Sequence, residues 1–111
     1  MSIHHIFVRL DGRPSLGIAA SDPPQTGGAV IFSFESDEKE PGKLLALAEK
    51  LMPPFRVESL KRGRWELLEK TFPANGGGLD EAMTVGAAHA RIDTPLRVVC
   101  GDTLLRNWPA N

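Results

Sequence analysis

The feature that most constrains this chain is the way proline and glycine punctuate its sequence. The 111 residues include 11 glycines and 9 prolines, with adjacent pairs at Pro23-Pro24, Gly27-Gly28 and Pro53-Pro54. Because such pairs interrupt helices and strands, the elements between them must be short and joined by many turns. The chain length is also close to that of one ordinary domain. We therefore expect a single domain over residues 1–111.

Three apolar segments in the first third of the chain predict strands. Residues 3–10 and 16–20 flank Asp11-Gly12, an arrangement that is typical of a β-hairpin. Residues 29–35 are rich in β-branched and aromatic side chains, which favour a strand. Residues 21–28 are predicted to form a loop, because they contain both Pro-Pro and Gly-Gly. This part of the chain therefore predicts a three-stranded antiparallel unit.

A helix is predicted after these strands. Pro41 follows a run of carboxylates, a combination that is typical of the first turn of a helix. Apolar side chains then recur at helical spacing and predict one buried face, made of Leu44, Leu45, Leu47, Ala48 and Leu51. Pro53-Pro54 should end the helix near Met52, because the residue before a proline disfavours helical geometry.

Residues 55–72 allow two interpretations. They can form a hairpin, with strands at 55–60 and 65–70 around Lys61-Arg62-Gly63-Arg64. They can also form a helix over residues 58–70. Gly63 would cost an exposed helix about 1 kcal/mol relative to alanine, so the hairpin is favoured.

The remaining segments predict one more helix and one more strand. Residues 73–78 are expected to be a loop, and Asp80 is expected to cap a helix whose small inward side chains allow close packing on a sheet. Those inward residues are Ala82, Met83, Gly86, Ala87 and Ala90. Residues 96–100 predict a strand, and Trp108 is expected to dock the end of the chain.

Together these elements predict an α+β fold with the order β-β-β-α-β-β-α-β. We expect a mainly antiparallel sheet of about five or six strands, with two helices packed on one face.

Charge and cysteine content exclude several classes of protein. Thirteen basic against fourteen acidic residues give a formal charge of −1, which argues against a general binder of nucleic acid or of anionic membranes. The single cysteine excludes an internal disulfide and a four-ligand zinc site built on thiolates. No signal peptide or membrane span is recognisable. We therefore expect a cytoplasmic protein, in a bacterium or in a phage-infected cell.

One set of residues could carry out nucleophilic catalysis. Cys100 could act as the nucleophile, with His89 as its base and Asp102 orienting the base. However, Cys100 ends an apolar strand, where a cysteine is more often a buried thiol, and no family signature surrounds it. We therefore favour a non-enzymatic protein.

Metal and ligand sites have equally weak signals. His4-His5 could bind a metal with His89 or Asp93, but neighbouring side chains of a strand project to opposite faces. We therefore expect no metal and no cofactor. The run Asn75-Gly76-Gly77-Gly78 before a helix resembles a phosphate cradle, although it fits no nucleotide-binding motif.

The near-neutral total conceals two charged runs that are candidate partner-binding surfaces. The basic run carries +3 between residues 56 and 64, with cations at Arg56, Lys61, Arg62 and Arg64. The acidic run carries −3 between residues 35 and 40, with carboxylates at Glu35, Asp37, Glu38 and Glu40. Opposite charges of this kind suit a protein partner, or head-to-tail association of identical chains.

We therefore expect a small protein that binds another macromolecule, such as an immunity protein, a toxin antidote or a phage inhibitor of host defence. One alternative is a small-ligand or nucleotide binder that uses the glycine-rich loops. A second alternative is a cysteine-dependent enzyme.

Overall fold

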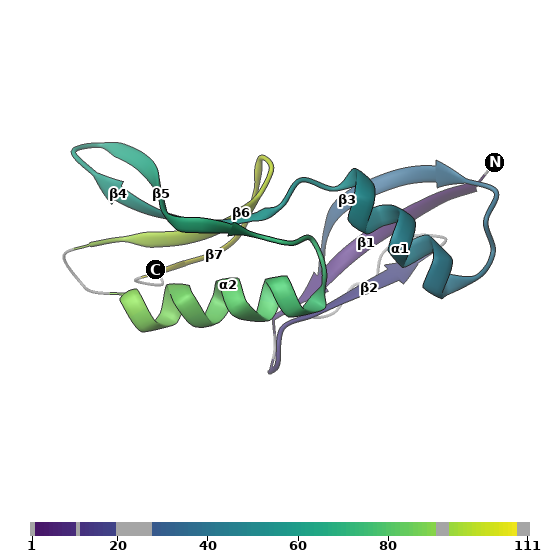
Figure 1. Cartoon of the computed structure of the whole chain (residues 1–111), viewed down its shortest axis with the longest axis horizontal. Helices are drawn as coiled ribbons and strands as arrows, with labels where there is room; N and C mark the ends of the chain where they lie inside the picture. The colour runs from purple at the N-terminus through teal and green to yellow at the C-terminus, as the bar shows by residue number, and fades with distance from the viewer. Residues whose placement is uncertain (1, 11, 20–27, 91–93, 109–111) are drawn as a thin grey trace. The chain divides into compact units, whose positions relative to one another are not determined.

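A computed structural model describes residues 2–10, 12–19, 28–90 and 94–108. Within these residues, seven strands and two helices follow one another in the order βββαββαββ (Figure 1). The predicted α+β class is confirmed, and so is the predicted order, with one further strand added at its end. The predicted loop at residues 21–28 lies outside the described residues except for Gly28, which begins β3.

The contacts within the chain divide it into two units, Met1–Met52 and Pro53–Asn111. Each unit has its own sheet among the described residues, with the order β2-β1-β3 in the first and β5-β4-β6-β7 in the second. The strands are antiparallel as predicted, but they form two sheets where one sheet was expected. The single domain over residues 1–111 stays a prediction.

The first unit is built around β1 (Ser2–Arg9), which pairs with β2 (Ser15–Ala19) and with β3 (Gly28–Ser36). The predicted β1–β2 hairpin is therefore confirmed. Alternation along β1 buries one face of the strand, including Ile6 and Val8.

Helix α1 (Pro41–Leu51) follows β3. Pro41 occupies the start of the helix as predicted, and the Met52 N–H donates to the Ala48 carbonyl at its end. Leu44 and Ala48 are buried, whereas Leu51 is 53% exposed. The expectation that Leu51 faces inward is therefore wrong. The buried face of α1 includes fewer residues than the apolar positions of its sequence.

The second unit begins with a hairpin of β4 (Phe55–Lys61) and β5 (Arg64–Phe72). This confirms the hairpin interpretation of residues 55–72. The two turn residues have positive φ angles, 53° at Arg62 and 79° at Gly63, as a type I′ turn requires. Phe55, Val57 and Ser59, which alternate along β4, are buried, and Glu58 on the opposite face is buried as well.

Helix α2 (Gly76–His89) lies along the four-stranded sheet (Figure 1). It begins at Gly76, so the predicted loop at 76–78 and the predicted cap at Asp80 are wrong. The actual cap is Asn75, whose Oδ1 accepts a hydrogen bond from the Gly78 N–H at 2.7 Å. The buried side of α2 includes Ala82, Met83 and Gly86 as expected, whereas Ala87 is exposed and Ala90 is half-buried.

Strand β6 (Leu96–Cys100) is confirmed, and a turn at Gly101 leads into a strand that was not predicted, β7 (Thr103–Trp108). Trp108 pairs with Leu96, and its ring occupies the space that a Cβ atom on Gly86 would need. The expected docking of Trp108 is therefore confirmed, and the absence of a side chain at Gly86 is what allows α2 to approach the ring.

Candidate functional site

The tip of the β4–β5 hairpin carries three exposed cations, Lys61, Arg62 and Arg64, which we call the basic tip. Together with Glu66 they line a hollow of about 530 Å³. Among the described residues, none of the three cations forms an ion pair. The tip of the hairpin therefore carries a net positive charge, with the Glu66 carboxylate lining the same hollow.

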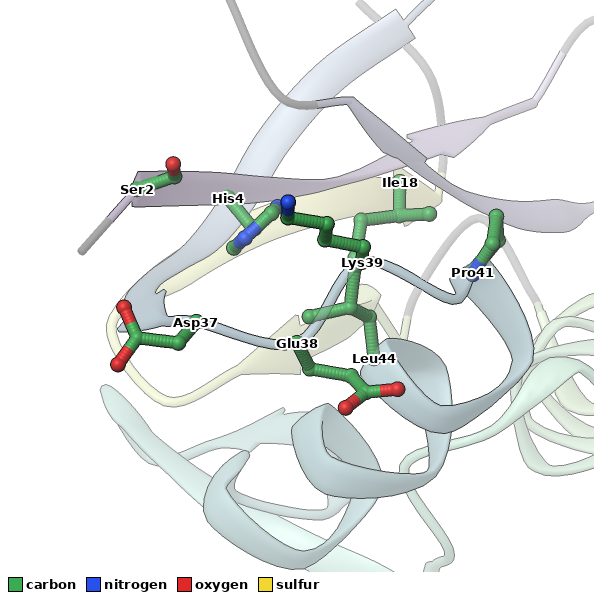
Figure 2. Close-up of a pocket in the computed structure, with 8 residues that line it drawn as sticks. All are labelled: Ser2, His4, Ile18, Asp37, Glu38, Lys39, Pro41 and Leu44. Carbon is green, nitrogen blue, oxygen red and sulfur yellow. The ribbon is translucent and has the colours of Figure 1, made fainter.

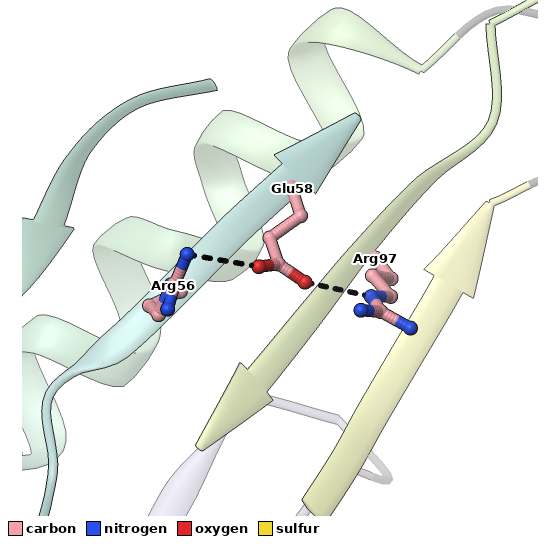
Figure 3. Close-up of polar contacts among 3 residues, drawn as sticks. All are labelled: Arg56, Glu58 and Arg97. Atoms are coloured by element: carbon pink, nitrogen blue, oxygen red, sulfur yellow. Dashed lines mark hydrogen bonds and ion pairs between the residues drawn. The ribbon is translucent and has the colours of Figure 1, made fainter. Parts of the chain in front are cut away.

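Arg56, the fourth residue of the predicted basic run, belongs to a separate cluster. Its Nη2 lies 3.1 Å from Oε2 of Glu58, and the Arg97 Nε donates to Oε1 of the same carboxylate at 2.8 Å. Figure 3 shows the Glu58 carboxylate between the two guanidinium groups. We call these three residues the arginine–glutamate cluster. Sequence analysis missed Arg97, because only the pairing of β4 with β6 brings it opposite Glu58.

This cluster lies on the face of the second sheet that points away from α2 (Figure 3). Trp65 and Leu67 of β5 share this face, because cross-strand pairing places Leu67 opposite Glu58. The Arg97 guanidinium lies 4.2 Å from the centre of the Trp65 ring, a cation–π contact. Leu67 is 40% exposed and Leu104 of β7 is 54% exposed, so this face combines apolar and cationic groups at its surface.

Glu58 orders the two arginines. Glu58 is only 5% exposed. Burial of a carboxylate is unfavourable unless its charge is compensated and its oxygens are hydrogen-bonded. Arg56 and Arg97 supply this compensation, and the geometry in turn fixes their guanidinium groups. Each guanidinium has five N–H donors, so donors remain for an incoming acceptor. A hollow of about 290 Å³ adjoins the cluster and is also lined by Asp102 and Leu104.

The predicted acidic run is divided among different environments in the first unit. Glu35 is exposed on β3, and Glu40 precedes α1 and lies 3.6 Å from the Lys43 ammonium. Asp37 and Glu38 instead line a pocket of about 470 Å³ (Figure 2). Sequence analysis did not find this pocket, because no spacing rule connects the run with β1.

The predicted catalytic residues have separate partners. Cys100 is buried, its Sγ donates to the Pro53 carbonyl at 3.5 Å, and burial raises the pKa of the thiol above its usual value. His89 Nδ1 donates to the Val85 carbonyl at 3.0 Å, and its Nε2 lies 3.8 Å from Glu69. Asp102 is exposed in the turn before β7. These contacts do not assemble the arrangement that thiol activation requires.

The two histidines of β1 have different partners, as expected for neighbours on a strand. His4 Nε2 lies 3.4 Å from the Ser36 carbonyl, whereas His5 Nδ1 lies 2.7 Å from the Ser33 hydroxyl. No group of three or more potential metal ligands occurs among the described residues, and Asp93 lies outside them.

The glycine-rich run is the first turn of α2. Asn75 already accepts the Gly78 N–H, while Gly76 and Gly77 are exposed. The run therefore forms a capped helix start, and the ligand site at Asn75-Gly76-Gly77-Gly78 stays a prediction.

Comparison with known proteins gives no family for this chain. Neither protein-family models, nor curated proteins, nor solved structures yield a match. Among the described residues, no helix has both the length and the apolar character that crossing a membrane requires.

Proposed function

We propose that this chain is a non-enzymatic binding protein that recognises an acidic surface of another protein through its second unit. It would act in the cytoplasm of a bacterium or of a phage-infected cell, as an inhibitor, an immunity protein or an antidote. One observation supports this proposal above all others. The basic tip exposes three cations, none of which pairs with a carboxylate among the described residues.

The hairpin gives this charge a defined position. The type I′ turn fixes the backbone between Lys61 and Arg64, which pair with each other across the hairpin. Cations held on a short, ordered turn lose less conformational freedom on binding than cations on a long loop. A positive tip also accelerates encounter with an acidic partner and disfavours basic ones.

The face of the second sheet that points away from α2 suits the centre of a protein interface. Aromatic residues and arginine are enriched in interface cores, and Trp65 and Arg97 are stacked here beside exposed leucines. A carboxylate of the partner could accept hydrogen bonds from Arg56 and Arg97, which Glu58 already holds in place. The arginine–glutamate cluster would therefore fix the position of a partner that the basic tip attracts.

Several features favour a protein partner over a nucleic acid. Glu66 lies within the hollow at the tip, and Asp102 lies within the hollow beside the cluster. These carboxylates would repel a regular phosphate backbone, whereas a protein can offer them a donor at a matching position. The formal charge of −1 also provides no general attraction for polyanions.

The test compares two charge reversals that change the net charge equally. Arg62→Glu/Arg64→Glu alters the basic tip, and Lys43→Glu/Lys50→Glu alters exposed positions of α1. Each variant and the wild type are immobilised for capture from host lysate, and a captured protein is then purified and titrated. We expect an acidic protein whose affinity falls by about tenfold or more only with the tip variant.

Two results would contradict the proposal. One is equal retention of the captured protein by the tip variant and by the α1 variant. The other is capture that disappears after nuclease treatment, because the tip would then bind nucleic acid.

A further inference from the structure

The first unit contains the pocket of about 470 Å³ that Asp37 and Glu38 line. We call it the first-unit pocket. Its volume falls in the range of about 300 to 1,000 Å³ that is usual for small-molecule sites. Its walls come from β1, from β2, from the segment between β3 and α1, and from the start of α1 (Figure 2). Four parts of the chain therefore converge on one cavity.

One wall of the pocket is apolar. Ile18 of β2 lies across from Pro41 and Leu44 of α1 (Figure 2). Leu44 is only 4% exposed, so the apolar wall reaches the interior of the unit. A hydrocarbon or aromatic group placed here would remove apolar surface from water, which favours binding.

A buried imidazole also lines this pocket. His4 is only 5% exposed, and its ring lies against that of Phe34, with centroids 5.7 Å apart. Its Nε2 lies at a long 3.4 Å from the Ser36 carbonyl, and Nδ1 has no hydrogen-bond partner among the described residues. The His4 ring therefore forms part of the pocket wall, with Nδ1 as an acceptor when Nε2 donates to the Ser36 carbonyl.

The charged side chains that line the pocket point in different directions. Figure 2 shows the Lys39 side chain extending toward β1, where His4 lies, whereas the carboxylates of Asp37 and Glu38 point away from His4. Lys39 forms no ion pair with another described residue. The polar side of the pocket therefore offers the Lys39 ammonium, which suits an anion, beside the His4 ring, whose Nε2–H donates to the Ser36 carbonyl.

We propose that the first-unit pocket binds a small organic carboxylate with an apolar body. The carboxylate accepts a hydrogen bond from the Lys39 ammonium, and the apolar body packs against Ile18, Pro41 and Leu44. A single negative charge matches the single ammonium group on this side of the pocket. This site lies in the first unit and is independent of the protein-binding surface proposed for the second.

The experiment is an NMR titration of the full ¹⁵N-labelled chain with three probes of similar shape. Phenylacetate carries the carboxylate, phenylacetamide is its neutral analogue, and phenethylamine carries the opposite charge. We expect saturable shifts from phenylacetate at the amides of Ile18, Lys39 and Leu44. Phenylacetamide should bind about tenfold more weakly, because the charge-assisted hydrogen bond is lost.

Two pairs of variants locate the site. Lys39→Gln should weaken phenylacetate binding by about tenfold, whereas Lys43→Gln, at an exposed position of α1, should not change it. Lys39 is exposed, so the variant is expected to fold. Arg62→Glu/Arg64→Glu should bind phenylacetate like the wild type, which separates this site from the basic tip.

Three results would overturn the proposal. The first is the absence of phenylacetate binding at concentrations up to about 10 mM, because a dissociation constant above this value means negligible affinity. The second is equal binding of phenylacetamide and phenylacetate. The third is stronger binding of phenethylamine, which would show that the carboxylates of Asp37 and Glu38 dominate the pocket.

Discussion

Substituting Gly86 by alanine tests the packing that positions α2 on the second sheet. In most helices this change stabilises, because alanine exceeds glycine in helix propensity by about 1 kcal/mol. Here the new methyl group would overlap Cζ3 and Cη2 of the Trp108 ring. Overpacking of this kind costs about 1 to 3 kcal/mol, so we expect Gly86→Ala to destabilise the protein by about 1 kcal/mol.

Gly76→Ala is the matched control, because a Cβ atom at Gly76 has no neighbour within 4 Å. We expect this control to stabilise by about 0.4 to 1 kcal/mol. Urea unfolding followed by far-UV circular dichroism measures both variants without relying on the fluorescence of Trp108. If Gly86→Ala stabilised as much as Gly76→Ala, the proposed contact between α2 and Trp108 would be refuted.

A double-mutant cycle attributes the effect to the ring. Trp108→Leu removes the ring atoms that the methyl group meets, so Gly86→Ala should become stabilising in that background. The expected coupling between the two sites is about 2 kcal/mol, which exceeds the usual deviation from additivity of about 0.5 kcal/mol. A coupling near zero would show that the helix accommodates the methyl group without contact with Trp108.

Two further predictions concern Asn75 and Cys100. Asn75→Ala should lower the free energy of unfolding by about 1 kcal/mol, because the Gly78 N–H loses its acceptor; an unchanged urea midpoint would contradict this. Native Cys100 should react slowly with iodoacetamide at neutral pH, because burial raises the pKa of its thiol. The reaction should become faster only when the pH exceeds the pKa of a free thiol. Labelling as fast in the native as in the unfolded protein would contradict the buried thiol.

Much of the fold could be predicted because turn and helix signals in this sequence are local. The hairpin at residues 55–72 follows from Gly63 and from the alternation of Phe55 and Val57, and α1 follows from Pro41 and its apolar spacing. Strand β7 was missed because Arg106 and Asn107 interrupt its apolar pattern. Its pairing with β6 supplies the hydrogen bonds that form the strand, and this pairing is not visible in local composition.

The start of α2 shows how tertiary contacts override helix propensity. Three consecutive glycines disfavour a helix, yet α2 begins with them. The Asn75 cap stabilises this turn, and the Pro73 carbonyl occupies the space that a Cβ atom on Gly78 would need. Glycine is therefore required at this position by close packing, which a propensity scale does not include.

The candidate sites were predictable only as far as their residues lie close together in sequence. The basic tip was found because Lys61, Arg62 and Arg64 surround one turn. Arg97 lies 39 residues from Glu58, so only the register between β4 and β6 brings them together. For the same reason the predicted basic run does not form one surface. Arg56 contacts Glu58 in the arginine–glutamate cluster, whereas the other three cations form the basic tip.

The turn at Arg62 connects the fold with the proposed function. A left-handed conformation costs a residue with a Cβ atom roughly 1 to 2 kcal/mol, and asparagine or glycine suits the first position of a type I′ turn better. Arg62 has this conformation, with a φ angle of 53°, and its exposed side chain gains no ion pair among the described residues in return. The fold alone therefore gives no reason for arginine at this position. The positive φ angle itself belongs to the type I′ turn, and a partner that binds the guanidinium group would supply a reason for arginine there.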